Sequence, residues 1–236
     1  SEKDIPEISA TEYILSNGVR VVAKHTNFKN DQILFSAQSK GGMSLYYDCD
    51  VPSLYFASDL VDRAGIAELD YSSLEKKLKG KRISLSPNIT AFTESLGGSA
   101  APKDLDLFFQ YINAFFTNPR KDTAVYQLVM DETKEQLKAM TSNPMYQFFG
   151  ALLDALKQGD IYQKSPLSMD DEYLSRVDYE RAYYLYQERF ANPADFNFYF
   201  VGNFDEAELK DLLCTYIASM PTTDKKEEIN TKVFKS

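Results

Sequence analysis

The chain has 236 residues, of which 44% are hydrophobic and 26% are charged, so its composition is that of an ordinary globular protein able to bury one large core or two small ones. Its net charge of -9 argues against a nucleic-acid partner, because affinity for phosphates requires clustered Lys and Arg. It contains no apolar run of about 18 residues, so the sequence predicts no membrane segment.

The first 50 residues favour β-strands. Residues 13–15 and 19–22 are rich in β-forming side chains and flank Asn17-Gly18, the strongest short signal for a hairpin. Residues 33–37 form a further expected strand, which ends at Gly41-Gly42. The chain is therefore expected to open with three strands before any helix.

Helical spacing of apolar residues begins after Asp50, which is the expected N-cap of a helix that ends at Gly65. A second, short helix is expected to begin at Ser72, whose spacing to Glu75 fits a capping box, and to end at Gly80.

Two more strands are expected at residues 82–86 and 89–93. Their side chains alternate around Pro87-Asn88, which predicts a tight turn at that dipeptide. Gly97-Gly98 is interpreted as the end of this β-unit.

The second half of the sequence is dominated by helical patterns. Helices are expected at residues 102–116, 122–140, 143–159, 179–190 and 206–218. Residues 196–202 are apolar at nearly every position, which predicts a central strand buried on both faces. The expected fold class is α+β, with an antiparallel or mixed sheet of five to six strands packed by several helices. Residues 1–221 are expected to form one domain, and residues 222–236 a charged, flexible tail or linker.

Catalytic chemistry has little support in the sequence. A zinc site needs several converging His, Cys or carboxylate ligands, and His25 is the only histidine. We interpret it as a surface or capping residue. Cys49 and Cys214 are interpreted as isolated thiols, although their pairing is left open. Phosphate-binding glycine loops and a hydrolase nucleophile elbow are absent from the sequence.

Two acidic groups are candidate cation sites. Asp48, Asp50, Asp59 and Asp62 fall within one turn-to-helix segment, and residues 170–172 form the other group. Neither has the spacing of a calcium loop, so helix capping and surface solvation are the preferred interpretation.

The order of elements resembles one domain of the pitrilysin/insulinase family of zinc peptidases. The residues that carry the resemblance are LSNGVRVV at 15–22, GGMSLY at 41–46 and VGNFD at 201–205. Residues 15–46, together with residues 84–87 and 97–105, look most like the first domain of the second half of long bacterial members. The resemblance implies a LuxS/pitrilysin-like metalloprotease fold, and a chain that is roughly a quarter of its parent.

Members of this family carry the zinc motif His-x-x-Glu-His on the first helix. By position, Tyr55 and Asp59 replace the two histidines here, and Ser58 replaces the general base. The family's third ligand would fall within residues 131–136, where Glu132 and Glu135 are interpreted as surface residues paired with Lys134 or Lys138. We therefore expect no catalytic residue, no metal ligand and no cofactor site in this chain.

The resemblance implies a non-catalytic domain that helps to form a peptide-binding chamber and packs against sister domains. Zinc, and proteolysis of a peptide or small-protein substrate, would then belong to the full-length parent, and a long bacterial parent would place the chain in the periplasm or cell envelope. Two alternatives are a stand-alone scaffold of the same fold and an enzyme of another class that uses the acidic groups or the cysteines.

Overall fold

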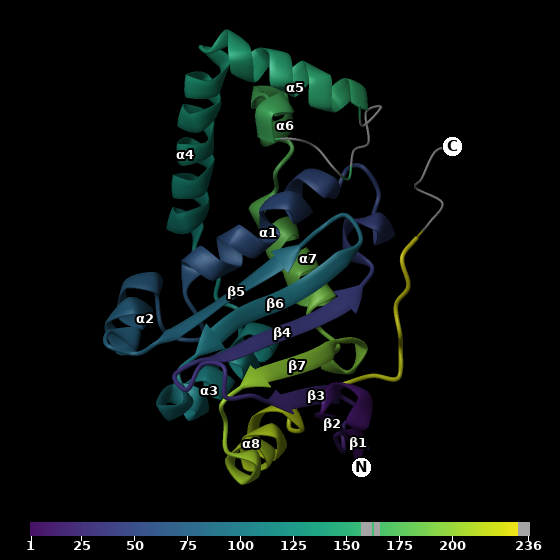
Figure 1. Cartoon of the computed structure of the whole chain (residues 1–236). Helices are drawn as coiled ribbons and strands as arrows, with labels where there is room; N and C mark the ends of the chain where they lie inside the picture. The colour runs from purple at the N-terminus through teal and green to yellow at the C-terminus, as the bar shows by residue number, and fades with distance from the viewer. Residues whose placement is uncertain (157–161, 163–165, 231–236) are drawn as a thin grey trace.

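The computed structural model describes residues 1–156, 162 and 166–230. It contains one sheet of seven strands in the order β1-β2-β3-β7-β4-β6-β5 (Figure 1). The strands are β1 Glu2–Ile5, β2 Ala10–Ile14, β3 Arg20–His25, β4 Ile33–Lys40, β5 Ile83–Ile89, β6 Thr93–Ala100 and β7 Asn197–Gly202. The expected five to six strands were too few, because the polar sequence of the edge strand β1 has no alternating pattern.

The described part of the chain contains eight α-helices. They are α1 Val51–Ala64, α2 Tyr71–Leu78, α3 Leu105–Thr117, α4 Thr123–Thr141, α5 Pro144–Leu156, α6 Asp171–Ser175, α7 Tyr179–Arg189 and α8 Glu206–Leu212. A π-helical turn, Leu213–Ile217, continues α8, and short 3-10 turns occupy Pro6–Ile8, Gly42–Leu45, Pro102–Asp104, Pro166–Ser168 and Pro193–Asp195. The α+β fold class is confirmed.

Strand β7 lies at the centre of the sheet, as predicted. It pairs in parallel with β3 and antiparallel with β4, which makes the sheet mixed. The expectation that this strand is buried on both faces is wrong, since Phe198 and Phe200 are fully buried while Tyr199 between them is 39% exposed.

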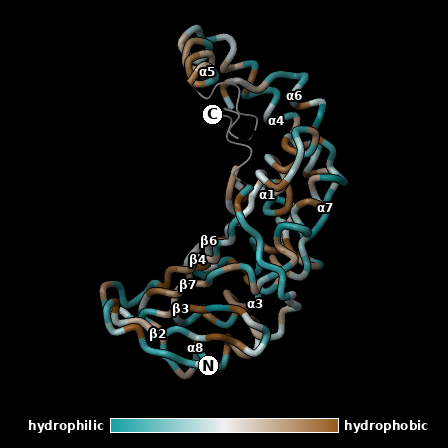
Figure 2. The backbone as a smooth tube through the Cα atoms, turned by 90° about the vertical axis from the view of Figure 1, so that its right-hand side faces the viewer, coloured by the Kyte–Doolittle hydropathy of each residue, from teal (hydrophilic) through white to brown (hydrophobic). Residues whose placement is uncertain are grey.

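Within the residues that the structure describes, only one face of the sheet is covered. Along β4 the side chains alternate strictly, with Phe35 and Ala37 buried and Leu34 exposed. Helices α1, α3 and α7 lie behind the covered face (Figures 1 and 2). Phe109 of α3 stacks on Phe200 of β7 with ring centroids 5.0 Å apart, so aromatic packing joins this helical layer to the central strand.

The turn between β5 and β6 is not where the sequence pattern placed it. β5 continues through Pro87-Asn88, and the chain turns at residues 90–92. Proline is tolerated there because β5 is an edge strand, where a missing backbone N–H costs no ladder bond. Gly97 and Gly98 do not end the unit but lie inside β6, where Gly98 pairs with Phe35 on one side and Leu85 on the other.

Two expected helix caps differ from the structure. Asp50 precedes α1 but its side chain caps no backbone N–H, because it accepts two hydrogen bonds from Arg181 instead. The short helix α2 is capped by Asp70, whose carboxylate accepts from the N–H of Ser73, so Ser72 lies inside the helix.

Helices α4, α5 and α6 form an arm that rises from the sheet, with α5 crossing its far end (Figure 1). The hydropathy colouring marks α5 as strongly hydrophobic (Figure 2). The predicted end of this helix at Gly159 lies outside the described residues. In the part of the chain that the structure describes, no helix has the length and hydropathy to cross a membrane.

Residues 222–230 have no helix or strand but contact the domain at several points. Thr222 donates to the carbonyl of Asn17, and the N–H of Glu227 donates to the carboxylate of Asp195. The amide of Asn192 donates to the carbonyl of Lys225. This terminal segment (residues 222–230) therefore lies along the body of the protein, and the domain boundary at residue 221 stays a prediction.

Candidate functional site

The position that resembles the zinc motif lies in the middle of α1. Tyr55, Ser58 and Asp59 share one side of the helix because they are spaced i, i+3 and i+4. Tyr55 is half-buried and its pKa is raised by burial. The hydroxyl of Ser58 is buried without a hydrogen-bond partner in the described structure. Of the three, only Asp59 carries a carboxylate, and its side chain is 53% exposed.

Arg63 lies between α1 and α4, at the place where these two helices could share a cation. Its Nη1 donates to Glu132 Oε2 on α4 at 2.7 Å and lies 3.9 Å from Asp59 Oδ2, one turn back on α1. This hydrogen bond lowers the pKa of Glu132. Burial raises the pKa of Asp59, although the nearby positive charge of Arg63 acts to lower it. The helix expected to supply a third ligand does face α1, but its carboxylate neutralises a guanidinium.

The remaining candidate ligands lie elsewhere. His25 is exposed at the end of β3, where its Nε2 lies 3.2 Å from Asn203 Oδ1. Cys49 and Cys214 are both exposed free thiols, so the structure joins them in no disulfide. Neither His25 nor a cysteine is on α1.

The acidic segment around α1 is mostly paired with arginines. Asp48 pairs with Arg176 at 3.0 Å, and Asp50 accepts a bidentate contact from Arg181 at 2.7 and 2.8 Å. Asp62 is the exception, with no hydrogen bond or ion pair in the described part of the chain. Among residues 170–172, Asp170 caps α6 by accepting from the N–H of Tyr173.

A buried charged cluster that the sequence analysis missed lies under the terminal segment. Arg189, at the end of α7, has a side chain only 3% exposed. It pairs with Glu227, donates to Tyr46 Oη at 2.7 Å, and lies 3.8 Å from Glu94. Glu94, Asp195 and Glu227 each place a carboxylate oxygen within 4.8 Å of the others. Arg189 supplies a positive charge among these carboxylates.

The pKa values in this cluster follow from its geometry. Burial raises the pKa of Glu94 to about 7, although Arg189 and the N–H of Gly42 pull it downward. Burial would also raise the pKa of Glu227, but hydrogen bonds from Arg189 and Lys225 hold it below its usual value. No motif marks these residues in the sequence, because they come from β6, α7 and the terminal segment and meet only through folding.

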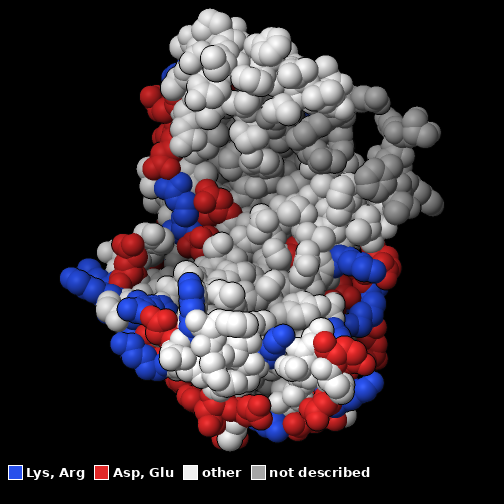
Figure 3. Space-filling model, in the orientation of Figure 1, with Lys and Arg blue, Asp and Glu red and all other residues white. Residues whose placement is uncertain are grey.

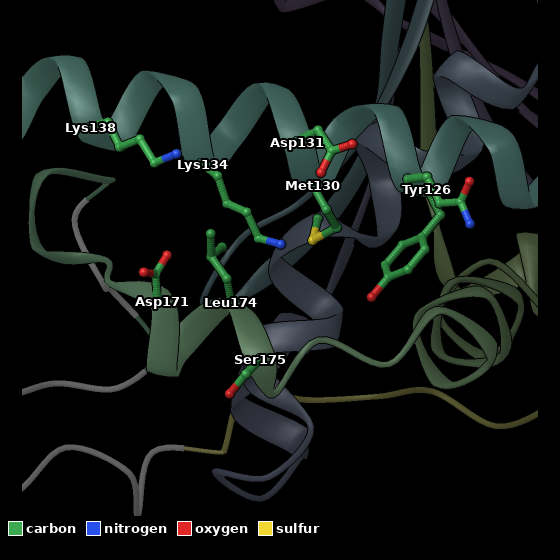
Figure 4. A pocket seen from close by; sticks show the side chains of 9 residues that line it. Tyr126, Met130, Asp131, Lys134, Lys138, Asp171, Leu174 and Ser175 are labelled. Atoms are coloured by element: carbon green, nitrogen blue, oxygen red, sulfur yellow. The ribbon is translucent and has the colours of Figure 1, made fainter.

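A hollow of about 570 Å³ separates α4 from α6 (Figure 4). Lys134 and Lys138 reach over it from α4 towards Asp171 and Leu174, and Tyr126 closes one end. The predicted pairing of Glu135 with Lys138 is present at 3.7 Å. The mixed charges of this hollow form no recognisable catalytic set.

The outer surface of α5 is an exposed apolar face. Six of its residues are 40% to 69% exposed: Met145, Tyr146, Phe148, Phe149, Leu152 and Leu156. The space-filling view shows few charged side chains around this end of the molecule, while charges crowd around the sheet and along the outer side of α4 (Figure 3). An apolar surface of this kind is typical of a protein interface.

No family model matches the chain, but curated relatives align with most of it. The zinc protease PQQL-like of Arabidopsis thaliana is 27% identical over 218 residues, which cover 92% of this chain and 20% of the relative. The probable zinc protease PqqL of Escherichia coli strain K12 is 24% identical over 226 residues, which cover 95% of this chain and 24% of the relative. The chain therefore spans about a quarter or less of these relatives.

Solved structures confirm the fold. The periplasmic protease PqqL from Escherichia coli superposes on 97% of this chain with a TM-score of 0.80 and 21% identity, using 25% of its own length. The separately solved first half of that protease covers the same share with a TM-score of 0.69 and 14% identity, using 49% of its length. The expected resemblance to a zinc protease is supported by the two relatives named above, and the solved structures share the fold of this chain.

Proposed function

We propose that this chain is a non-catalytic domain of a longer zinc metalloendopeptidase, where it helps to form the peptide-binding chamber and packs against sister domains. The observation that carries the proposal is the side of α1 described above. Tyr55, Ser58 and Asp59 provide no imidazole, and Glu132 is engaged by Arg63. Zinc and the proteolytic reaction would then belong to another domain of the parent.

The lengths of the related proteins support a place inside a larger polypeptide. This chain covers 49% of a solved half of PqqL, so two units of its size make up such a half. It superposes better on the complete protease than on its first half, with TM-scores of 0.80 and 0.69. That difference favours a counterpart in the second half, as the resemblance of residues 84–87 and 97–105 also does.

The exposed apolar face of α5 is the surface that we assign to sister-domain packing. Phe148 and Leu156 are 63% and 69% exposed, and leaving such side chains in water is unfavourable by about 25 cal/mol per Å² of apolar area. The relatives are four to five times longer than this chain, which leaves room for a partner surface within the same polypeptide. For a bacterial parent we propose a location in the periplasm, because PqqL from Escherichia coli is a periplasmic protease.

Metal analysis of the purified chain tests the proposal. Inductively coupled plasma mass spectrometry should find no stoichiometric zinc, and peptide cleavage should be absent with or without a chelator. One tightly bound zinc per chain, together with chelator-sensitive cleavage, would contradict the assignment.

The packing surface is tested in the full-length parent. Phe148→Glu with Leu156→Glu should weaken association between this domain and the rest of the protease, measured by limited proteolysis at the domain boundary. Asp171→Asn, on α6 and outside the apolar face, is the matched control. Purification of the 236-residue chain as a subunit of an unrelated complex would favour a stand-alone scaffold instead.

A further inference from the structure

The terminal segment (residues 222–230) is held against the domain mainly by polar contacts. None of its residues is fully buried, and Ile229 is its one hydrophobic residue. The N–H of Thr223, for example, donates to Asn192 Oδ1 at 2.9 Å. In Figure 1 the segment runs as a single extended trace beside the sheet. Because it buries little apolar area, its release costs less free energy than opening the core of the domain.

A hollow of about 410 Å³ lies between the terminal segment and the sheet. Its lining includes Gln38 and Ser39 of β4, Thr93 of β6, and Lys226 and Glu227 of the segment. Both walls of the hollow are therefore polar. Water can replace the contacts of the segment when it leaves, so the interface is one that can open without exposing the hydrophobic core.

Glu94 of β6 is the buried acid beneath this segment, with a side chain only 1% exposed. It lies 3.8 Å from Arg189 and accepts a hydrogen bond from the N–H of Gly42 at 2.8 Å. The charged and polar groups that face it are Arg189 of α7, Glu227 of the terminal segment, Asp195 and the N–H of Gly42 in 3-10 turns, and the hydroxyl of Ser39 in β4. One guanidinium thus faces three carboxyl groups.

The balance of charge in this group depends on the proton of Glu94. Burial is the main cause that raises the pKa of Glu94, to about 7, and repulsion from Glu227 adds to it. Hydrogen bonds hold the pKa of Glu227 low, so Glu227 stays ionised around neutral pH. When Glu94 is protonated, Arg189 pairs with Glu227 alone. When Glu94 is ionised, it competes with Glu227 for the guanidinium and repels it.

We propose that the terminal segment is a pH-dependent latch, docked on the domain while Glu94 is protonated and released when Glu94 loses its proton to solvent and takes Arg189 from Glu227. Release separates the two carboxylates and admits water to Glu94, so the docked state binds a proton that the released state does not hold. Raising the pH through about 7 therefore favours release, and lowering it favours docking.

Release would loosen the connection to the following domain in the longer parent that we propose. While the segment is docked, the N–H of Asn230 donates to Ser44 Oγ at 3.2 Å, and the connection begins there. Release frees residues 222–230, which lengthen the connection by up to about 30 Å at about 3.3 Å per residue. This consequence rests on the proposed function, whereas the release itself belongs to the 236-residue chain.

Exchange of the Glu227 amide with solvent measures the docking equilibrium, because this N–H donates to Asp195 only while the segment is docked. Nuclear magnetic resonance on the ¹⁵N-labelled chain gives its protection factor, the ratio of the intrinsic to the observed exchange rate, which removes the intrinsic effect of pH. The protection factor should fall about tenfold from pH 6 to pH 8. The amide of Ser73, which donates to the exposed carboxylate of Asp70 on α2, is the control and should keep its protection factor.

Glu94→Gln is neutral at every pH, so its Glu227 amide should have the same protection factor at pH 6 and pH 8. The matched control is Glu228→Gln, which breaks only the exposed pair with Lys40 and should keep the tenfold change. In the wild type the ¹³C signal of the Glu94 carboxyl should titrate with a midpoint near 7, a measurement that needs no variant.

Two results would overturn the latch. One is a protection factor of Glu227 that is unchanged from pH 6 to pH 8, or that changes equally in Glu94→Gln. The other is equal protection of Glu227 and the amides of β7, which would mean that the segment leaves only when the whole domain unfolds.

Small-angle X-ray scattering of the full-length parent tests the longer connection. The radius of gyration should be larger at pH 8 than at pH 6, and this difference should vanish in Glu94→Gln. Equal radii at the two pH values would overturn the effect on the following domain. Zinc bound to the 236-residue chain would contradict the proposed function but would leave the exchange measurements on the latch unaffected.

Discussion

Arg189 and Glu227 form an ion pair whose two side chains are 3% and 18% exposed, and this pair holds the terminal segment against the end of α7. The guanidinium of Arg189 also contacts Tyr46 and Glu94. The set of contacts around Arg189 is therefore complete only when Glu227 is bound. A segment whose composition suggests a loose tail thus completes a buried group of charges.

Removing Glu227 should strongly destabilise the protein. Glu227→Ala leaves a buried guanidinium with Glu94 as its nearest carboxylate at 3.8 Å, and breaking a buried pair from one side costs about 3 kcal/mol. Urea unfolding followed by circular dichroism measures the change. The control is Glu228→Ala, which breaks the solvent-exposed pair with Lys40 and should change the free energy of unfolding by about 0.5 kcal/mol or less. Equal effects of the two substitutions would contradict this account.

Glu94 should make the protein less stable as the pH rises from about 4.5 to about 7. Burial raises its pKa in the folded state, so in this window the folded protein retains a proton that the unfolded chain has released. The groups that face Glu94 include Arg189 of α7, Glu227 of the terminal segment, Asp195, the hydroxyl of Ser39 and the N–H of Gly42.

Glu94→Gln is neutral at every pH and removes this dependence. The free energy of unfolding of the variant, relative to the wild type, should therefore increase between about pH 5 and about pH 8, by at most about 3 kcal/mol. Urea titrations at both pH values supply the comparison. A constant difference between the two proteins would mean that Glu94 ionises in the folded state as it does in the unfolded chain.

Adjacent glycines in β6 should respond very differently to alanine. A Cβ on Gly98 would lie 2.0 Å from the carbonyl oxygen of Ser84, so Gly98→Ala must displace β5 and should cost about 2 kcal/mol. A Cβ on Gly97 has the carbonyl oxygen of Phe35 as its nearest neighbour at 4.0 Å, so Gly97→Ala should be neutral or slightly stabilising. Thermal unfolding of the pair of variants tests the register of β5 on β6.

A zinc site should be recoverable by substitution on α1. Tyr55→His, Ser58→Glu and Asp59→His restore the inverted motif, and Arg63→Ala frees Glu132 to act as a third protein ligand. The four changes together should bind one zinc per chain, measured by mass spectrometry after dialysis. The same protein with Arg63 retained should bind zinc more weakly, since the guanidinium competes for Glu132. Indistinguishable zinc affinities would show that Arg63 does not control Glu132.

Sequence patterns predicted the elements whose signals are local. The hairpin at Asn17-Gly18, the amphipathic helix α1 and the central strand β7 all follow from turn chemistry or periodicity. The turn at Pro87-Asn88 was misplaced because proline is a strong local breaker, and only the position of β5 at the sheet edge makes it harmless.

The candidate site was predictable only in part. The replacement of zinc ligands by Tyr55 and Asp59 could be read from position along α1. Two ion pairs could not be predicted from the sequence, because each joins residues from separate elements. They are the pair of Arg63 with Glu132 and the pair of Arg189 with Glu227. Contacts between residues 38 to 69 positions apart leave no periodic trace in one sequence.

Because β7 lies between β3 and β4, the sheet can be completed only after β7 has been synthesised. Both neighbouring strands leave the ribosome more than 150 residues before β7, yet neither has a partner on that side until β7 arrives. While the more than 150 intervening residues are translated, the two strands therefore present unpaired edges, which is when a chaperone that shields extended segments would act on this chain.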